Sequence, residues 1–419
     1  MRVPSSLLPV VESVTSLSVL NLLNMALPLV TLPYLIRVVG LANYGRYAVV
    51  YAMAQYVVLV STYGFNFSAT RQVSVSRANQ SSLDHILSAV LASKALLSVL
   101  PSLFFVSLSA FFFRGDYLLM MVFGLGIVVG DILNPVWLYQ GLEKMRYLTI
   151  VAFVSQLLFT VLIFVLVRRP SDYIYIIMYN SAGYLVAGIV SLCIACRVVG
   201  VSLRWPSWAA VACQLKDGFY LFLSTLFMNL YRNSNTFVLG LFVDERLVGM
   251  YAGAEKVVKA VQSMANPVSA AFFPHMADAF RHHSLRQNIV SLRRLAVVVG
   301  GLLLVLMLLC VAFAPWLNSL LLGAQAAGGT RLIRLLSPVI LVGGLNYVLG
   351  IVGLVNLGAR KAFLYIVAVS GTLSLVLLLL TVSRWGVESA VSSMLTAELL
   401  IFVCCVFYLL RLYGGHYRC

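Results

Sequence analysis

Twelve runs of about 20 mostly apolar residues succeed one another along the chain, with little sequence between them. A helix of that length crosses the hydrocarbon core of a bilayer, where no water is present to satisfy backbone N–H and C=O groups. The sequence therefore predicts an all-α polytopic membrane protein with about 12 transmembrane helices. The approximate limits of the predicted spans are 14–36, 46–64, 84–112, 117–138, 148–167, 173–196, 217–241, 248–272, 292–314, 332–355, 361–382 and 387–410.

The composition excludes a large domain in water. Of the 419 residues, 62% are hydrophobic and 10% are charged, and the mean hydropathy is +0.99. The longest loops, 197–216 and 275–291, are shorter than a catalytic domain, so no enzyme is expected and any function must lie within the helical bundle. Cys193 and Cys196 lack a second pair of ligands, so we predict no metal site and no bound cofactor.

The distribution of positive charge predicts the orientation in the membrane. An even number of spans places both termini on one side, and sixteen Lys and Arg residues fall on that side against nine in the opposite loops. Because cytoplasmic segments carry the excess of Lys and Arg, both termini are expected in the cytoplasm. Topology then accounts for most of the formal charge of +16, and nucleic acid is not an expected partner. The segment before the first span holds one basic residue, Arg2, and no cleavage site, so this span is expected to remain as an anchor.

Two short patterns recur at similar distances along the chain. The Gly-x-Tyr-Ala pattern of Gly45–Ala48 returns at Gly249–Ala252, an offset of 204 residues. The pattern Leu-Asn, six residues, Gly-Leu at 133–142 returns at 345–354, an offset of 212 residues. Both patterns link a span to the sixth span after it, which predicts two homologous six-helix bundles, 1–200 and 201–419. Such halves rock against each other around a central site in alternating access.

The spans 217–241 and 248–272 carry ionisable residues at membrane depth, where each costs roughly 2.5 to 3.5 kcal/mol on insertion scales. Polar residues follow one face of each helix at spacings of three and four. These residues are Thr225, Asn229, Arg232 and Thr236 in the first helix and Lys256, Lys259, Ser263 and Asn266 in the second. The pattern predicts a wet, positively charged cavity that binds a phosphate or an acidic sugar. The predicted substrate-binding residues are Arg232, Lys256, Lys259, Lys94 and Arg37.

The same charges have a second interpretation, in which they pair with one another. Glu255 precedes Lys259 by four residues, the favourable order on a helix. Lys94 has two candidate partners, Asp131 and Glu398. The carboxylates Asp131, Glu255 and Glu398 are also candidates for coupling transport to H⁺ or Na⁺, because burial disfavours the charged form of an acid. The sequence leaves both interpretations open.

Two segments carry a family resemblance. The first contains Pro33-Tyr34-Leu35-x-Arg37, Tyr44-Gly45-x-Tyr47 and Tyr63-Gly64-Phe65-Asn66-x-Ser68-Ala69-Thr70-Arg71. The second contains Asn229-Leu230-Tyr231, Asn235, Val248-Gly249-x-Tyr251, Ala254-Glu255-Lys256, Pro267 and Pro274. Both resemble polysaccharide flippases of the Wzx type, in the multidrug/oligosaccharidyl-lipid/polysaccharide (MOP) exporter superfamily. Ser61-Thr62 departs from the pattern, since many relatives carry an acidic residue there.

The resemblance implies the MOP exporter fold, with two six-helix bundles around a central cavity. It implies a flippase of O-antigen or capsule biosynthesis in the bacterial inner membrane, which moves undecaprenyl-pyrophosphate-linked oligosaccharides from the cytoplasmic to the periplasmic leaflet. Membrane lipids, a polysaccharide polymerase and a chain-length regulator are the implied partners. A small-molecule or multidrug antiporter of the same fold is the alternative. The chain has no Asp-x-Asp pair, which disfavours a membrane glycosyltransferase.

Overall fold

The computed structural model describes residues 8–113, 115–264, 285–323 and 326–415. Within them, the side chains of residues 8–26, 220–221, 224, 227–228, 230–233, 285–286 and 414–415 are outside the description. Every regular element in the described ranges is a helix. The chain divides into two compact units, Met1–Leu226 (unit 1) and Phe227–Cys419 (unit 2).

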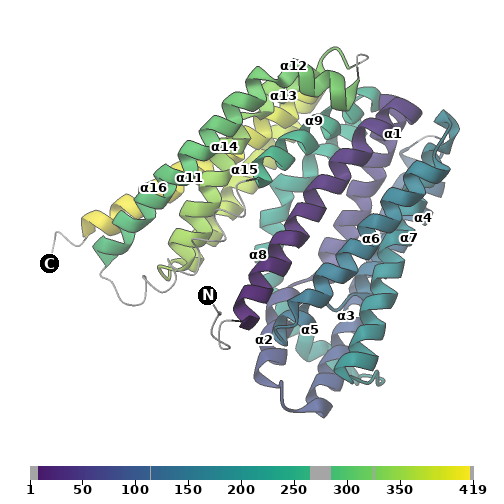
Figure 1. Ribbon diagram of the computed structural model, residues 1–419, viewed down its shortest axis with the longest axis vertical. Coiled ribbons are helices and arrows are strands. Elements are labelled where there is room, and N and C mark those ends of the chain that lie inside the picture. Colours follow the sequence, from purple (N-terminus) through teal and green to yellow (C-terminus); the bar gives the residue numbers. More distant parts are fainter. Residues whose placement is uncertain (1–7, 114, 265–284, 324–325, 416–419) are drawn as a thin grey trace. The chain divides into compact units, whose positions relative to one another are not determined.

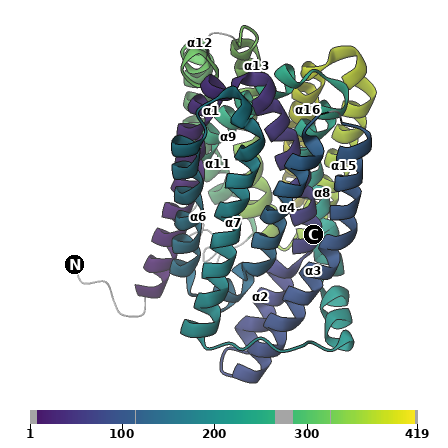
Figure 2. The same cartoon turned by 90° about the vertical axis from the view of Figure 1, so that its right-hand side faces the viewer.

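Unit 1 is a bundle of long helices. Its elements are α1 (Leu8–Thr62), α2 (Phe65–Val75), α3 (Gln80–Phe111), α4 (Tyr117–Leu133), α5 (Val136–Gly141), α6 (Met145–Leu166), η1 (Pro170–Asp172), α7 (Tyr173–Ile194), η2 (Ala195–Val199) and the first part of α8 (Trp208–Phe242). The long helices α1, α3, α4, α6 and α7 run side by side (Figure 2). The pair α4 and α7 forms the most extensive helix contact of the unit.

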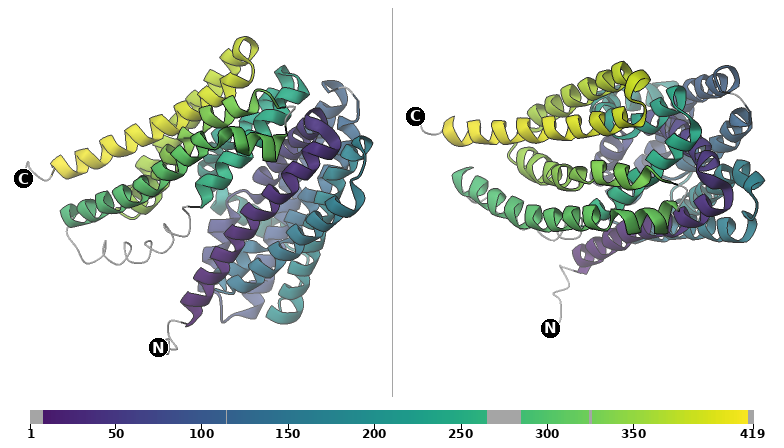
Figure 3. Two further views of the ribbon diagram at one scale, coloured as in Figure 1. Left: turned by 45° about the horizontal axis from the view of Figure 1, so that its top comes forward. Right: turned by 90° about the horizontal axis from the view of Figure 1, so that it is seen from above.

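Unit 2 begins within α8 and repeats the plan of a helical bundle (Figures 1 and 3). Its further elements are α9 (Glu245–Ser263), α11 (Leu285–Ala312), α12 (Ala314–Leu317), η3 (Asn318–Leu322), α13 (Gly329–Leu336), α14 (Pro338–Asn346), η4 (Tyr347–Val355), α15 (Arg360–Trp385) and α16 (Val387–Gly415). The short helix α14 packs against α9, α11 and α16, so it lies inside the bundle.

The helix α1 contains the first two predicted spans, joined at Gly40. This glycine has φ +83° and ψ +163°, a backbone conformation that is not helical and that side chains disfavour. In a straight helix, residues 34 and 46 would lie about 18 Å apart. Instead both contact the connection between α6 and α7, through Tyr34 Oη to the Val167 carbonyl at 2.7 Å and Arg46 Nη1 to Tyr173 Oη at 3.0 Å. The chain therefore reverses direction within α1, at the non-helical Gly40.

Within the described residues, the predicted spans coincide with helices or with a half of α1. The end of the predicted span 248–272, with the predicted polar residue Asn266, lies outside the described residues. Among the described residues, nine segments have the length and hydropathy to cross a membrane. The difference arises because Leu27–Val75 counts as one segment and because α8 and α9 carry polar residues that lower their hydropathy. The two units meet within α8, whereas the predicted halves, 1–200 and 201–419, meet just before it. Those predicted boundaries stay a prediction.

The close contact of α4 and α7 depends on glycine. A Cβ added at Gly130 would lie on the backbone carbonyl of Tyr184, nearer than real Cβ atoms approach. A Cβ at Gly124, in the same helix, would meet Ile177 Cγ1 at 3.5 Å and Val50 Cγ1 at 3.6 Å, which are ordinary contacts. Small residues at such positions let two transmembrane helices approach closely, which strengthens their packing.

We expect Gly130→Ala to force α4 and α7 apart and to cost about 1–3 kcal/mol, the usual penalty of overpacking. Gly124→Ala is the matched control and should leave stability almost unchanged. The measurement is the temperature at which half of the purified protein leaves the monodisperse fraction in detergent. Equal melting temperatures for the two variants would contradict the packing argument.

Candidate functional site

A charged cluster lies inside unit 1, where three helices meet. Lys94 of α3 contacts Asp131 of α4, with its Nζ 2.8 Å from Oδ2 and 2.6 Å from the backbone carbonyl. The hydroxyl of Thr62, at the end of α1, donates to the same Asp131 Oδ2 at 3.2 Å. Lys94 is buried, with 4% of its side chain exposed, and Asp131 is partly buried at 22%. The contacts identify Asp131 as the partner of Lys94.

The sequence of α3 directs Lys94 inward. Leu83, Leu87, Val90 and Lys94 follow one another at spacings of four, three and four residues, so they lie on one face of the helix, and all are buried. A lone ammonium in such a place would be strongly disfavoured, because it would lose its hydration without compensation. Asp131 supplies the compensating charge.

Further polar groups extend from this cluster between α1 and α7. Asn180 Nδ2 donates to Tyr47 Oη at 2.7 Å, and the hydroxyls of Tyr51 and Tyr184 lie 3.4 Å apart. Tyr47 and Tyr51 are four residues apart in α1, and Asn180 and Tyr184 are four apart in α7, so each pair lies on one helix face. The sequence analysis missed these residues. Their four-residue spacing was the available signal, but tyrosines in a membrane protein are commonly interfacial anchors.

The polar centre of unit 2 is Glu398 of α16, which is 2% exposed. Asn346 of α14 donates through Nδ2 to Glu398 Oε2 at 2.6 Å and to its backbone carbonyl at 2.8 Å. The Oδ1 atom of Asn346 is buried and accepts no hydrogen bond from the described residues. Gly343 leaves the space for this group, since a Cβ there would lie 2.5 Å from Gln262 Nε2 and 3.2 Å from Glu398 Oε1.

The repeated sequence patterns make equivalent contacts in the two units. Asn134 accepts from Ser191 of α7 through Oδ1 at 2.7 Å, and Asn346 bonds Glu398 of α16, so each asparagine joins the fourth and sixth helices of its half. The offset of 212 residues that relates these asparagines also relates Asp131 to Gly343. The acid of this polar contact region, Asp131 or Glu398, therefore lies on the fourth helix in unit 1 and on the sixth in unit 2.

The helix α9 carries a second ion pair. Lys259 Nζ lies 2.9 Å from Glu255 Oε1, and the two side chains are 39% and 11% exposed. Lys256 is half-buried, and within the described part of the chain it forms no ion pair. The structure thus contains the ion pair between Glu255 and Lys259 that the sequence left open. Lys256 differs from Lys259 because it does not take part in this pair.

The remaining predicted substrate-binding residues are Arg37 and Arg232. Arg37 is exposed on α1, three residues before Gly40. Arg232 lies on α8, but its side chain is outside the described residues. Lys94 belongs to unit 1, whereas Lys256 and Lys259 belong to unit 2. The assignment of these residues to substrate binding stays a prediction.

The fold is similar to that of solved transporters of the MOP superfamily. It matches an inward-facing multidrug resistance MATE family transporter with a TM-score of 0.73 and 13% identity, covering 97% of this chain and 99% of the other. It matches the lipid II flippase MurJ, in an inward closed conformation, with a TM-score of 0.75 and 11% identity, covering 95% and 87%. The predicted fold class, an all-α polytopic membrane protein of the MOP type, is confirmed.

The sequence identifies the family within this fold. Residues 10–280 match the family described as "Polysaccharide biosynthesis protein", and the chain belongs to it. A relative from Escherichia coli (strain K12), described as "Putative O-antigen transporter", is 28% identical over 394 residues, which cover 93% of this chain and 94% of the relative. The predicted family resemblance is therefore confirmed, and the chain is a multi-pass membrane protein.

We expect Lys94→Met or Asp131→Leu alone to destabilise the protein by roughly 3–5 kcal/mol, because each leaves one buried charge without its partner. The double variant should recover most of this loss, since apolar replacement of both partners of a buried pair is often neutral. Thermal stability of the purified variants tests the pairing. Transport by the double variant tests whether the pair serves function beyond stability: a stable but inactive protein would assign a functional role to Lys94 or to Asp131.

Proposed function

We propose that the protein is a flippase that moves undecaprenyl-pyrophosphate-linked oligosaccharides, the repeat units of O-antigen or capsule, from the cytoplasmic to the periplasmic leaflet. The observation that carries this proposal is membership of the polysaccharide biosynthesis family, whose matching relatives include one named for O-antigen transport. The fold shared with a lipid II flippase adds support, because lipid II is also a lipid-linked sugar. The function is transport rather than catalysis.

The cationic residues of α8 and α9 are the proposed contacts for the pyrophosphate or for acidic sugars. A guanidinium such as that of Arg232 binds two oxygens of a phosphate at once, and the Lys256 ammonium acts as a point charge. Lys94 and Lys259 each lie within 3 Å of a carboxylate, so their positive charge is already compensated. We therefore rank Lys256 above Lys94 and Lys259 as a substrate contact, and Arg232 and Arg37 stay proposed contacts.

We propose Glu398 as the group that couples transport to an H⁺ or Na⁺ gradient. Asp131 and Glu255 each lie 2.8–2.9 Å from a lysine ammonium. Glu398 accepts a hydrogen bond from the Asn346 amide, which both a carboxylate and the carbonyl oxygen of a carboxylic acid can accept. Binding or loss of a cation at Glu398 would change the bond that joins α14 to α16.

A multidrug antiporter of the same fold is the second candidate. The observation that favours it is the likeness to a multidrug resistance MATE family transporter over nearly the whole chain. A basic cavity is poorly suited to cationic drugs, because like charges repel. In the flippase proposal, a polysaccharide polymerase and a chain-length regulator would act on the product and are the proposed partners.

In a strain that lacks the protein, we expect single lipid-linked repeat units to accumulate on the cytoplasmic side and surface polysaccharide to be lost. Wild type and Arg232→Lys should restore the polysaccharide, whereas Arg232→Ala should not, if positive charge is what the site requires. The measurement is the amount of lipid-linked unit in each leaflet. Units that reach the periplasm without polymerising would indicate a polymerase instead, and unchanged polysaccharide with export of cationic dyes would favour the antiporter.

We expect Glu398→Gln to uncouple transport from the ion gradient while the protein still folds, since a glutamine side chain keeps the size and can accept from Asn346. Flux of H⁺ or Na⁺ into proteoliposomes during transport is the measurement. The matched control is Glu388→Gln on the same helix, where the exposed carboxylate pairs with Arg331 at 2.7 Å. Ion flux in Glu398→Gln equal to that in Glu388→Gln would exclude Glu398 as the coupling group.

A further inference from the structure

Two strongly exposed tryptophans lie where the segment between η2 and α8 joins α8. Trp205 is 101% exposed and Trp208 is 78% exposed. Exposed tryptophans are uncommon on surfaces that face only water, because their large rings gain free energy when they leave it. Leu203 and Val198, at 53% and 56%, add apolar area beside them. We name these four residues the linker surface.

The backbone next to the linker surface is held firmly by α3. Gln80 Nε2 donates to the Gly200 carbonyl at 2.7 Å, the Ser202 N–H donates to Asp84 Oδ1 at 2.8 Å, and the Arg204 N–H donates to Ser88 Oγ at 2.9 Å. Each bond fixes one residue of the linker opposite the next turn of the helix. The tryptophan that follows is thus presented by an ordered backbone.

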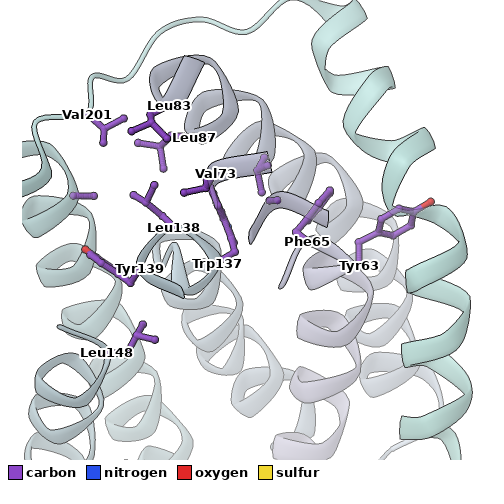
Figure 4. Packing of buried hydrophobic residues seen from close by; sticks show 13 residues of the cluster. Tyr63, Phe65, Val73, Leu83, Leu87, Trp137, Leu138, Tyr139, Leu148 and Val201 are labelled. Atoms are coloured by element: carbon purple, nitrogen blue, oxygen red, sulfur yellow. The ribbon is translucent and has the colours of Figure 1, made fainter. Parts of the chain in front are cut away.

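Two further contacts fix the direction of the side chains. The Arg204 guanidinium lies 3.2 Å from Asp84 Oδ2, and that carboxylate is 5% exposed. Val201 is buried in the apolar core beside Leu83 and Leu87 of α3 (Figure 4). Because Val201 and Arg204 point toward α3, the exposed rings of the linker surface are left on the outer side.

The hydrogen bonds to α3 also show which part of that helix the linker runs beside. From Gln80 to Ser88 the linker follows α3 inward over eight residues, about 12 Å. The helix has 32 residues, about 48 Å, and so exceeds a hydrocarbon core of about 30 Å. Its exposed large apolar residues lie between Leu96 and Phe111, whereas Ser88 lies near the other end of the span. The linker surface is therefore beside one end of a membrane-spanning helix.

The charges near this surface favour anionic lipid. Arg197 is exposed at the end of the α7–η2 segment, and Lys216 is exposed two turns into α8. Tryptophan with flanking Arg and Lys is the composition of protein segments that sit at the membrane interface. A cation near an anionic membrane surface gains enough free energy to enrich that lipid up to about five-fold.

We infer that the linker surface binds the headgroup region of the bilayer, with anionic phospholipids gathered around Arg197. The surface anchors the start of α8 to the membrane at the end of unit 1. The first part of α8 is also fastened to α2, through Gln214 Nε2 to Gln72 Oε1 at 2.7 Å and Gln72 Nε2 to Asp217 Oδ2 at 3.3 Å. Lipid and protein contacts together fix this end of the helix.

Tryptophan fluorescence in proteoliposomes tests the inference. The full-length chain has five tryptophans, and subtraction of the Trp205→Phe spectrum from that of wild type isolates the signal of Trp205. We expect lipids brominated near the headgroup to quench this signal and aqueous iodide to leave it largely unchanged. Trp385→Phe is the positive control, because Trp385 ends the span α15 and is 57% exposed. Trp208→Phe is a second variant on the same surface.

Each other outcome overturns the inference. Quenching by iodide alone would place Trp205 in water, and protection from both quenchers would place it against protein. The choice of lipid is tested with phosphatidylcholine vesicles that contain phosphatidylglycerol, with bromine on one lipid or the other at equal mole fraction. Bromine on phosphatidylglycerol should quench more strongly, by up to about five-fold per lipid, and Arg197→Gln should reduce the difference. Equal quenching in wild type would refute the preference for anionic lipid.

Discussion

The cost of removing charge from water determines which helices of this protein stay together. A buried ion loses several kcal/mol of hydration even after the protein relaxes, so each buried ammonium must lie next to an acid. In unit 1, Lys94 of α3 and Asp131 of α4 meet this requirement. The two residues are 37 positions apart in the sequence, so their ion pair joins two helices. In unit 2, Glu255 and Lys259 meet it within one turn of α9. The first pair joins two helices. The second lies within α9 and does not involve Lys256, the residue next to Glu255.

The two halves share a backbone plan and differ in their charges. The repeated tyrosines Tyr47 and Tyr251 both interact with an asparagine amide, from Asn180 at 2.7 Å in unit 1 and from Asn235 at 2.9 Å in unit 2. These asparagines lie on α7 and on α8, so the same polar contact joins different helix pairs. The repeat thus keeps the tyrosine and the type of its partner residue, but a different helix supplies that partner.

Hydropathy alone predicted the spans because the bilayer demands about 20 apolar residues per crossing wherever a helix faces lipid. It also predicted separate spans at 14–36 and 46–64, which α1 joins through Gly40. The partners of buried charges were not predictable in the same way. Asp131 and Glu398 were equal candidates for Lys94 in the sequence, and the choice depends on which helix lies beside α3. The polar contacts of Tyr47 and Tyr51 were hidden because an aromatic ring with a hydroxyl suits both a membrane interface and a buried hydrogen bond.

The position of the acids also argues for unequal roles of the two units in the proposed transport cycle. Asp131 pairs with the Lys94 ammonium and accepts a hydrogen bond from the Thr62 hydroxyl. In unit 2 the position related to Asp131 by the repeat is Gly343, and the space beside it holds Glu398 and Gln262. The repeat therefore replaces the acid of the fourth helix in unit 1 with a glycine in unit 2, and the space beside this glycine holds the acid to which we assign ion coupling.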